Sequence, residues 1–73
     1  MTEGELRAQF SAQLRKWINK KGITPYRLGR EMGLGNIRAV YEMLRIGIVP
    51  HAGNFAKMLT IFECTPEQFW GLK

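Results

Sequence analysis

Residues 24–38 read TPYRLGREMGLGNIR, with glycines at positions 29, 33 and 35. Thr24 followed by Pro25 is typical of a helix start, because threonine caps free N–H groups and proline tolerates the first helical position. Glycine inside the following helix costs about 1 kcal/mol relative to alanine. We therefore expect Gly29 to face a close helix crossing, and Gly33 to adopt a positive φ in the turn. The stretch predicts two short helices joined by a tight turn, a helix-turn-helix.

Further helices are expected on both sides of this stretch, where apolar residues recur at helical spacing. The first helix should cover roughly residues 4–21 and end at Gly22. After the glycine-containing turn, Asn36 can cap a helix that runs to about Arg45, with Gly47 as its C-cap.

The remainder of the chain indicates two more helices after a loop. Residues 47–53 read GIVPHAG and are expected to be irregular. Residues 55–62 carry a fourth apolar stripe, and TPEQ at 65–68 is a capping box that opens a last helix. The sequence thus predicts one all-α domain over residues 1–73, a compact bundle of about five short helices.

The composition is that of an ordinary globular domain, 45% hydrophobic and 23% charged. No apolar run approaches the roughly 20 residues of a membrane span, and the N-terminus lacks the pattern of a signal peptide. The single cysteine, Cys64, cannot form an internal disulfide. We expect a cytoplasmic protein of a bacterial cell, not associated with membranes.

The positive charge is concentrated in the middle of the chain. Residues 15–45 hold eight basic and two acidic residues, a net charge of +6, whereas the other residues together carry −1. Such a segment attracts polyanions, of which nucleic acid is the commonest, although it can also be a solvated surface.

Motifs for catalysis are missing from the sequence. It has no CxxC, HExxH or paired-carboxylate motif, and the GxG at residues 33–35 lacks the strand and third glycine of a dinucleotide loop. His51 and Cys64 lie on different segments, where His51 suits a structural or N-cap role and Cys64 a small buried one. We expect no enzyme, metal, cofactor or small-molecule ligand.

Taken in order, these motifs resemble the phage-repressor family of helix-turn-helix proteins, the Cro/C1 type with a lambda-repressor-like domain. The resemblance extends from about Leu6 to Leu72. It rests on the turn at residues 22–24, the two short helices of a motif at about residues 24–46, and the apolar and Thr-Pro-Glu pattern of residues 55–70. The resemblance implies a sequence-specific double-stranded DNA-binding transcriptional regulator, with its recognition helix at about residues 36–45.

The sequence departs from the family pattern at three points. Pro25 stands where the family often has a phosphate-contacting glutamine, and Gly29 where it commonly has alanine. The recognition helix is one residue further from the turn glycine if Val40 is its first buried aliphatic residue, but not if Ala39 is. This choice shifts the inferred base contacts by up to one position.

The resemblance implies a set of DNA contacts in the major groove and on the backbone. The base contacts would be Asn36, Ile37, Arg38 and Tyr41. The phosphate contacts would be Lys21, Thr24, Tyr26, Arg27 and Arg45. Each has a structural alternative: Asn36 can be only a cap, Ile37 can belong to the core, and Tyr41 can pack on a neighbouring helix.

A single recognition helix contacts few base pairs, so proteins of this kind commonly bind an inverted-repeat operator as dimers. We expect a small homodimeric repressor that acts by operator occupancy. Its dimer surface is predicted from the apolar residues that exceed what one small core needs: Ile46, Ile48, Val49, Phe69, Trp70 and Leu72. These residues can instead close the monomer core. The alternative function is a protein-interaction module, antitoxin-like or anti-repressor, that binds an acidic partner.

Overall fold

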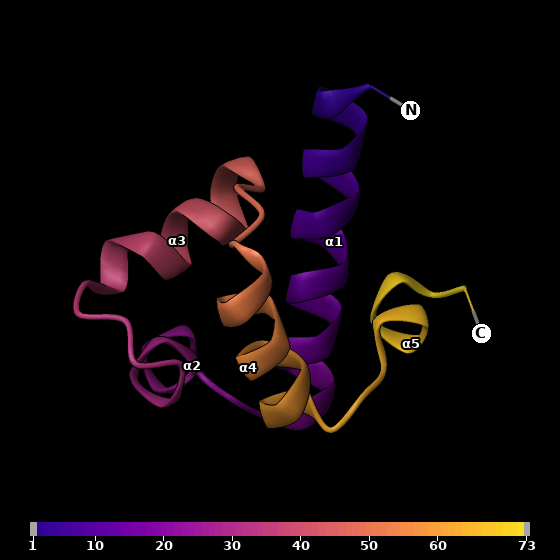
Figure 1. The fold of residues 1–73 in the computed structure, drawn as a ribbon. Coiled ribbons are helices and arrows are strands. Elements are labelled where there is room, and N and C mark those ends of the chain that lie inside the picture. Colours follow the sequence, from indigo (N-terminus) through magenta and orange to yellow (C-terminus); the bar gives the residue numbers. More distant parts are fainter. Residues whose placement is uncertain (1, 73) are drawn as a thin grey trace.

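The computed structural model describes residues 2–72, which form five α-helices and no strand (Figure 1). In chain order the helices are α1 (Glu3–Lys21), α2 (Pro25–Glu31), α3 (Ile37–Ile46), α4 (Ala52–Phe62) and α5 (Pro66–Trp70). The all-α class is therefore confirmed. Within the described part of the chain, no helix combines the length and apolar character needed to cross a membrane.

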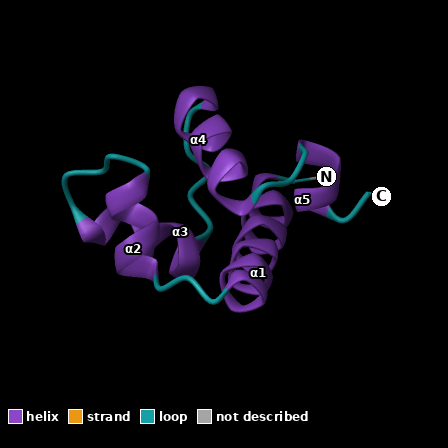
Figure 2. Ribbon diagram, turned by 90° about the horizontal axis from the view of Figure 1, so that it is seen from below, coloured by secondary structure: helices purple, strands orange, loops and turns teal. Residues whose placement is uncertain are grey.

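The long helix α1 is the centre of the arrangement. Helices α2 and α3 lie on one side of α1 and α5 lies on the other, while α4 packs between the two groups (Figures 1 and 2). The core between the helices contains Phe10, Leu14, Trp17, Ile18, Leu28, Met32, Val40, Met43, Met58, Phe62 and Phe69. Because every helix contributes to this one core, the chain forms a single packed unit.

The predicted helix starts are confirmed by side-chain caps. The hydroxyl of Thr24 accepts a hydrogen bond from the Arg27 N–H at 3.1 Å. Thr65 and Gln68 form the complete capping box of α5, with bonds of 3.2 and 2.9 Å. These bonds satisfy N–H groups that have no partner inside the helix.

The start of α4 differs from the sequence prediction. Residues 47–53 were expected to be a loop throughout, but α4 begins at Ala52. The Nδ1 atom of His51 accepts hydrogen bonds from the N–H groups of Gly53 and Asn54, at 3.1 and 3.3 Å. His51 is thus the N-cap of α4, one of the two roles expected for it.

The crossing of α2 and α3 explains the glycine inside α2. A Cβ atom at Gly29 would lie 2.7 Å from Cγ2 of Val40 on α3, closer than side chains tolerate. Gly33, in the turn of residues 32–36, has a φ of 77°, as predicted. The two glycines therefore allow α3 to cross directly over α2.

The same crossing decides the register of α3. Val40 is completely buried, whereas Ala39 is only partly buried. The first buried aliphatic residue is therefore Val40, and the segment between the turn glycine and the core of α3 is one residue longer than the family pattern.

We expect Gly29→Ala to destabilise the fold by about 1–2 kcal/mol. The added methyl group overpacks the crossing against Val40, which costs about 1–3 kcal/mol, while the better helix propensity returns up to about 1 kcal/mol. Urea denaturation of the variant measures the difference. Because the neighbour is a side chain, the double variant Gly29→Ala/Val40→Ala should be more stable than Val40→Ala alone. If the double variant is destabilised by the sum of the two single-variant losses in unfolding free energy, this account is contradicted.

Candidate nucleic-acid interface

Helix α3 has one buried side and one exposed side. Val40 and Met43 face the core, and Ile37 packs against its edge. The exposed side, which we call the α3 face, forms a shallow hollow of about 390 Å³ lined by Ile37, Arg38, Tyr41, Glu42 and Arg45. Three of the four residues predicted to contact bases, and one predicted to contact phosphate, are therefore brought together on one surface.

Asn36, the fourth residue predicted to contact bases, is engaged in the fold. Its Oδ1 atom accepts a hydrogen bond from the Arg38 N–H at 2.9 Å and caps α3. Pairing with adenine through two hydrogen bonds needs this same oxygen as well as the amide nitrogen. The cap role is thus confirmed, and in this conformation the two-bond contact with adenine is not available to Asn36.

The start of α3 adjoins α2 across a groove that contains Tyr26, Arg30, Asn36 and Ile37. Tyr26 is exposed over 63% of its surface, so its hydroxyl is free to contact a phosphate. Arg30 was not among the predicted contacts, although it lines the same groove. Its position one turn after Tyr26 on α2 is the sequence signal that could have found it.

Thr24 and Arg27 stand at the exposed start of α2. The Thr24 hydroxyl accepts the bond that caps α2. Arg27 forms an exposed ion pair with Glu31, with Nε and Oε1 3.4 Å apart. Because an exposed pair of this kind contributes little free energy, Arg27 can exchange Glu31 for an anion at small cost.

Lys21 lies elsewhere. At the C-terminal end of α1 it lines a small hollow together with Trp17, Lys20, Glu63 and Gln68, next to α4 and α5. Lys21 does not line the hollows that contain the predicted contacts of α2 and α3, so its assignment as a phosphate contact stays a prediction.

Most of the basic side chains near α3 are not neutralised within the protein. Within residues 2–72 the ion pairs are Arg7 with Glu3 and Arg27 with Glu31. Arg30, Arg38 and Arg45 are exposed and belong to neither pair. The surface around the α3 face is therefore positively charged, with Glu42 as the acid among its lining residues.

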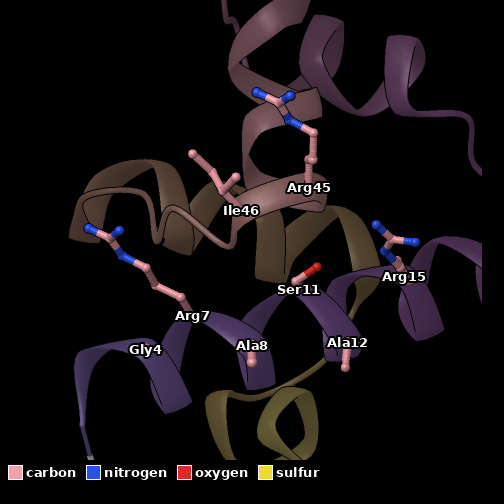
Figure 3. A pocket seen from close by; sticks show the side chains of 8 residues that line it. All are labelled: Gly4, Arg7, Ala8, Ser11, Ala12, Arg15, Arg45 and Ile46. Atoms are coloured by element: carbon pink, nitrogen blue, oxygen red, sulfur yellow. The ribbon is translucent and has the colours of Figure 1, made fainter.

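The residues predicted for a dimer surface fall into two separate groups. Ile46, Ile48 and Val49 are partly exposed at the end of α3 and in the loop after it. Ile46 borders a hollow along α1 that contains Ala8 and Ala12 (Figure 3). The second group lies on the opposite side of α1: Phe69 and Trp70 belong to α5, and Leu72 follows it (Figure 1).

For Phe69 the dimer prediction is wrong. Its side chain is completely buried, and its ring lies 5.6 Å from that of Phe10 and 5.5 Å from that of Phe55, measured between centroids. Its carbonyl also accepts a hydrogen bond from Trp17 Nε1 at 3.2 Å. Trp70 is partly buried beside this cluster, while Leu72 is 72% exposed. The alternative, that this end closes the monomer core, holds for Phe69.

Cys64 is a partly buried free cysteine that packs against the core. Burial raises the pKa of its thiol, against the smaller opposing effect of the Lys21 and Lys20 charges. The thiol is therefore protonated at neutral pH. No group of three or more His, Cys, Asp or Glu residues within residues 2–72 is arranged to hold a metal ion.

Comparison with known proteins gives no relative. No family model, curated protein or solved structure matches the chain.

Proposed function

We propose that this protein binds double-stranded DNA sequence-specifically and regulates transcription, most simply as a repressor that occupies its operator. The observation that carries the proposal is the α3 face. This face presents Arg38, Tyr41 and Arg45 on the exposed side of α3, which crosses α2 after a short turn. A helix in this setting can enter the major groove while the preceding helix crosses the backbone. As a transcription regulator of a bacterium or its phage, it would act in the cytoplasm.

Base recognition is assigned to the first two turns of α3. Arg38 has no ion-pair partner within residues 2–72 and can donate two hydrogen bonds to O6 and N7 of guanine. Tyr41 follows one turn later and is 54% exposed, so its ring can contact a thymine methyl group or its hydroxyl a phosphate. Ile37 can make an apolar contact from the edge of the same face.

Phosphate binding is assigned to the residues around this face. Tyr26 and Arg27 lie at the start of α2, and Arg45 lies near the end of α3. Arg30 is added to these because it shares the groove with Tyr26. Such contacts give affinity and fix the orientation of the protein, whereas the base contacts give sequence preference.

We further propose that the protein binds an inverted-repeat operator as a homodimer. Support comes from Ile46, Ile48 and Val49, large apolar residues that are each more than a third exposed at one end of α3. Two copies joined through this end would place two recognition helices on one DNA molecule, with half-sites about 34 Å apart. Sedimentation without DNA tests the preformed dimer: a monomer at high protein concentration would refute it.

The deciding experiment is selection of bound sequences from a random duplex pool at about 150 mM salt, where non-specific binding is weakened. An enriched inverted repeat would support a dimeric regulator and give its operator. A pool that stays random while affinity falls steeply with salt would mean that only phosphates are bound. In that case an acidic protein partner becomes the better hypothesis.

Arg38 and Arg27 should respond differently when each is replaced. With the selected operator, Arg38→Ala should lose about 1–3 kcal/mol of binding free energy and relax preference at one base pair. Arg27→Ala should weaken binding to all sequences alike and lower the slope of log K against log salt by about 1. Fluorescence anisotropy with the operator and a scrambled duplex measures both effects. Equal losses on both duplexes for Arg38→Ala would remove its assignment as a base contact.

A further inference from the structure

A second hollow lies between α1 and the helix-turn-helix, and residues of α1 line one side of it. This α1–α3 cleft, of about 480 Å³, is lined by Arg15, Ile18, Asn19, Pro25, Tyr41, Leu44 and Arg45. Ile18, Pro25 and Leu44 make much of its lining apolar, its polar groups come from both helices, and no acidic residue lines it. Neither Arg15 nor Asn19 was among the residues predicted to contact DNA.

Arg15 is held in place at this cleft. Its Nη2 atom donates a hydrogen bond to the carbonyl oxygen of Leu44 at 3.0 Å. The Ser11 hydroxyl donates to the same oxygen. Figure 3 shows Arg15 on α1 below the end of α3, with Arg45 above it on α3. One bond to Leu44 leaves most of the five N–H donors of this guanidinium free.

The remaining polar groups lie one helical turn from these arginines. Asn19 follows Arg15 by four residues on α1, and Tyr41 precedes Arg45 by four residues on α3. Residues four apart share a helix face, so each helix presents one arginine and one neutral hydrogen-bonding group. Two positive charges, an amide and a hydroxyl around a cleft without a carboxylate match the chemistry of a phosphate diester.

We propose that the α1–α3 cleft binds a backbone phosphate of duplex DNA through Arg15 and Asn19, together with Tyr41 and Arg45. This inference rests on the proposed function and extends the DNA-contacting surface from α2 and α3 to α1. Because Tyr41 and Arg45 border both the cleft and the α3 face, a phosphate held here would lie beside the groove that α3 enters. The contact would thereby fix the position of α3 along the DNA.

The test compares the salt dependence of binding for wild type, Arg15→Met and Lys16→Met, on a duplex about two helical turns long. Lys16 is the matched control, an exposed neighbour on α1 that does not line the cleft. Loss of one phosphate contact should lower the slope of log K against log salt by about 0.9. The affinity of Arg15→Met should fall about tenfold, while Lys16→Met should keep nearly the wild-type slope.

Arg15→Met also removes the hydrogen bond to Leu44. A second variant is therefore needed to separate loss of the phosphate contact from a change in the fold. Asn19→Asp leaves that bond intact and places a carboxylate in the cleft, one turn from Arg15. It should weaken DNA binding about tenfold through repulsion of the phosphate and should retain the wild-type circular dichroism spectrum. Folded Asn19→Asp protein with wild-type affinity would overturn the proposal.

The possible failures can be told apart. If wild type binds duplex DNA and Arg15→Met keeps the wild-type slope, the phosphate site is wrong and the proposed function stands. If Arg15→Met and Lys16→Met lose the same slope, the effect is one of overall charge and the site is again refuted. If wild type binds no duplex at all, the site and the proposed function fall together.

Discussion

Gly47→Ala should destabilise this protein by about 3 kcal/mol or more. Gly47 ends α3 with a φ of 72°, where an L-residue with a side chain costs about 1–2 kcal/mol. A Cβ atom here would also collide with the backbone carbonyl of Arg7 on α1. A backbone group cannot rotate away as a side chain can, so the end of α3 must separate from α1. Overpacking of this kind adds about 1–3 kcal/mol.

Thermal unfolding followed by circular dichroism measures this effect. For a domain of this size, about 3 kcal/mol corresponds to a loss of roughly 15 °C in Tm. Gly35→Ala is the matched control, because Gly35 does not have a positive φ and a Cβ there would have no neighbour within 4 Å. It should change the Tm little. If both variants melt like wild type, the close contact of α3 with α1 is not a feature of the folded state.

Phe69→Ala should be at least as damaging, with a loss of about 3–5 kcal/mol. The ring is completely buried and contacts the rings of Phe10, Phe55, Phe62 and Trp70. Its removal leaves a cavity that five-residue α5 cannot close by itself. The total stability of a chain this long is of the order of 4–11 kcal/mol, so a large share of the molecules would unfold near physiological temperature.

Leu72→Ala is the comparison for Phe69→Ala, since both residues were expected at a dimer surface. Leu72 is mostly exposed, so its truncation should change the unfolding free energy by less than about 0.5 kcal/mol. Denaturation at two protein concentrations separates core from interface. If Phe69→Ala lowers the unfolding free energy at high but not at low protein concentration, Phe69 lies at an interface. That result would contradict the assignment of Phe69 to the monomer core.

Local signals made most of the fold predictable from the sequence. Thr24, Asn36 and Thr65 cap their helices by bonds to N–H groups two or three residues away. Such bonds depend on neighbouring residues alone, so the sequence contains the information. The start of α4 was missed because Pro50 and Gly53 favour irregular structure, and this signal was given more weight than the N-cap role expected for His51.

Features that depend on distant residues were predicted less well. Ala39 and Val40 are adjacent at the edge of one apolar stripe, and only the crossing with Gly29 decides which is buried. Phe69 looked like an excess aromatic residue because its partners come from α1 and α4, far away in the sequence. The position of Arg15 beside α3 was not predicted for the same reason: its hydrogen-bond partner, Leu44, lies 29 residues away in the sequence.

The division of α3 into a buried and an exposed side has a consequence for how such a protein can evolve. Val40 and Met43 maintain the fold, while Arg38, Tyr41 and Arg45 have exposed side chains. Substitutions on the exposed side are expected to cost little stability. Mutation can therefore alter the exposed residues while selection retains the buried ones. One scaffold could in this way give rise to a lineage of proteins that differ in what the exposed side of α3 binds and share the same unfolding behaviour.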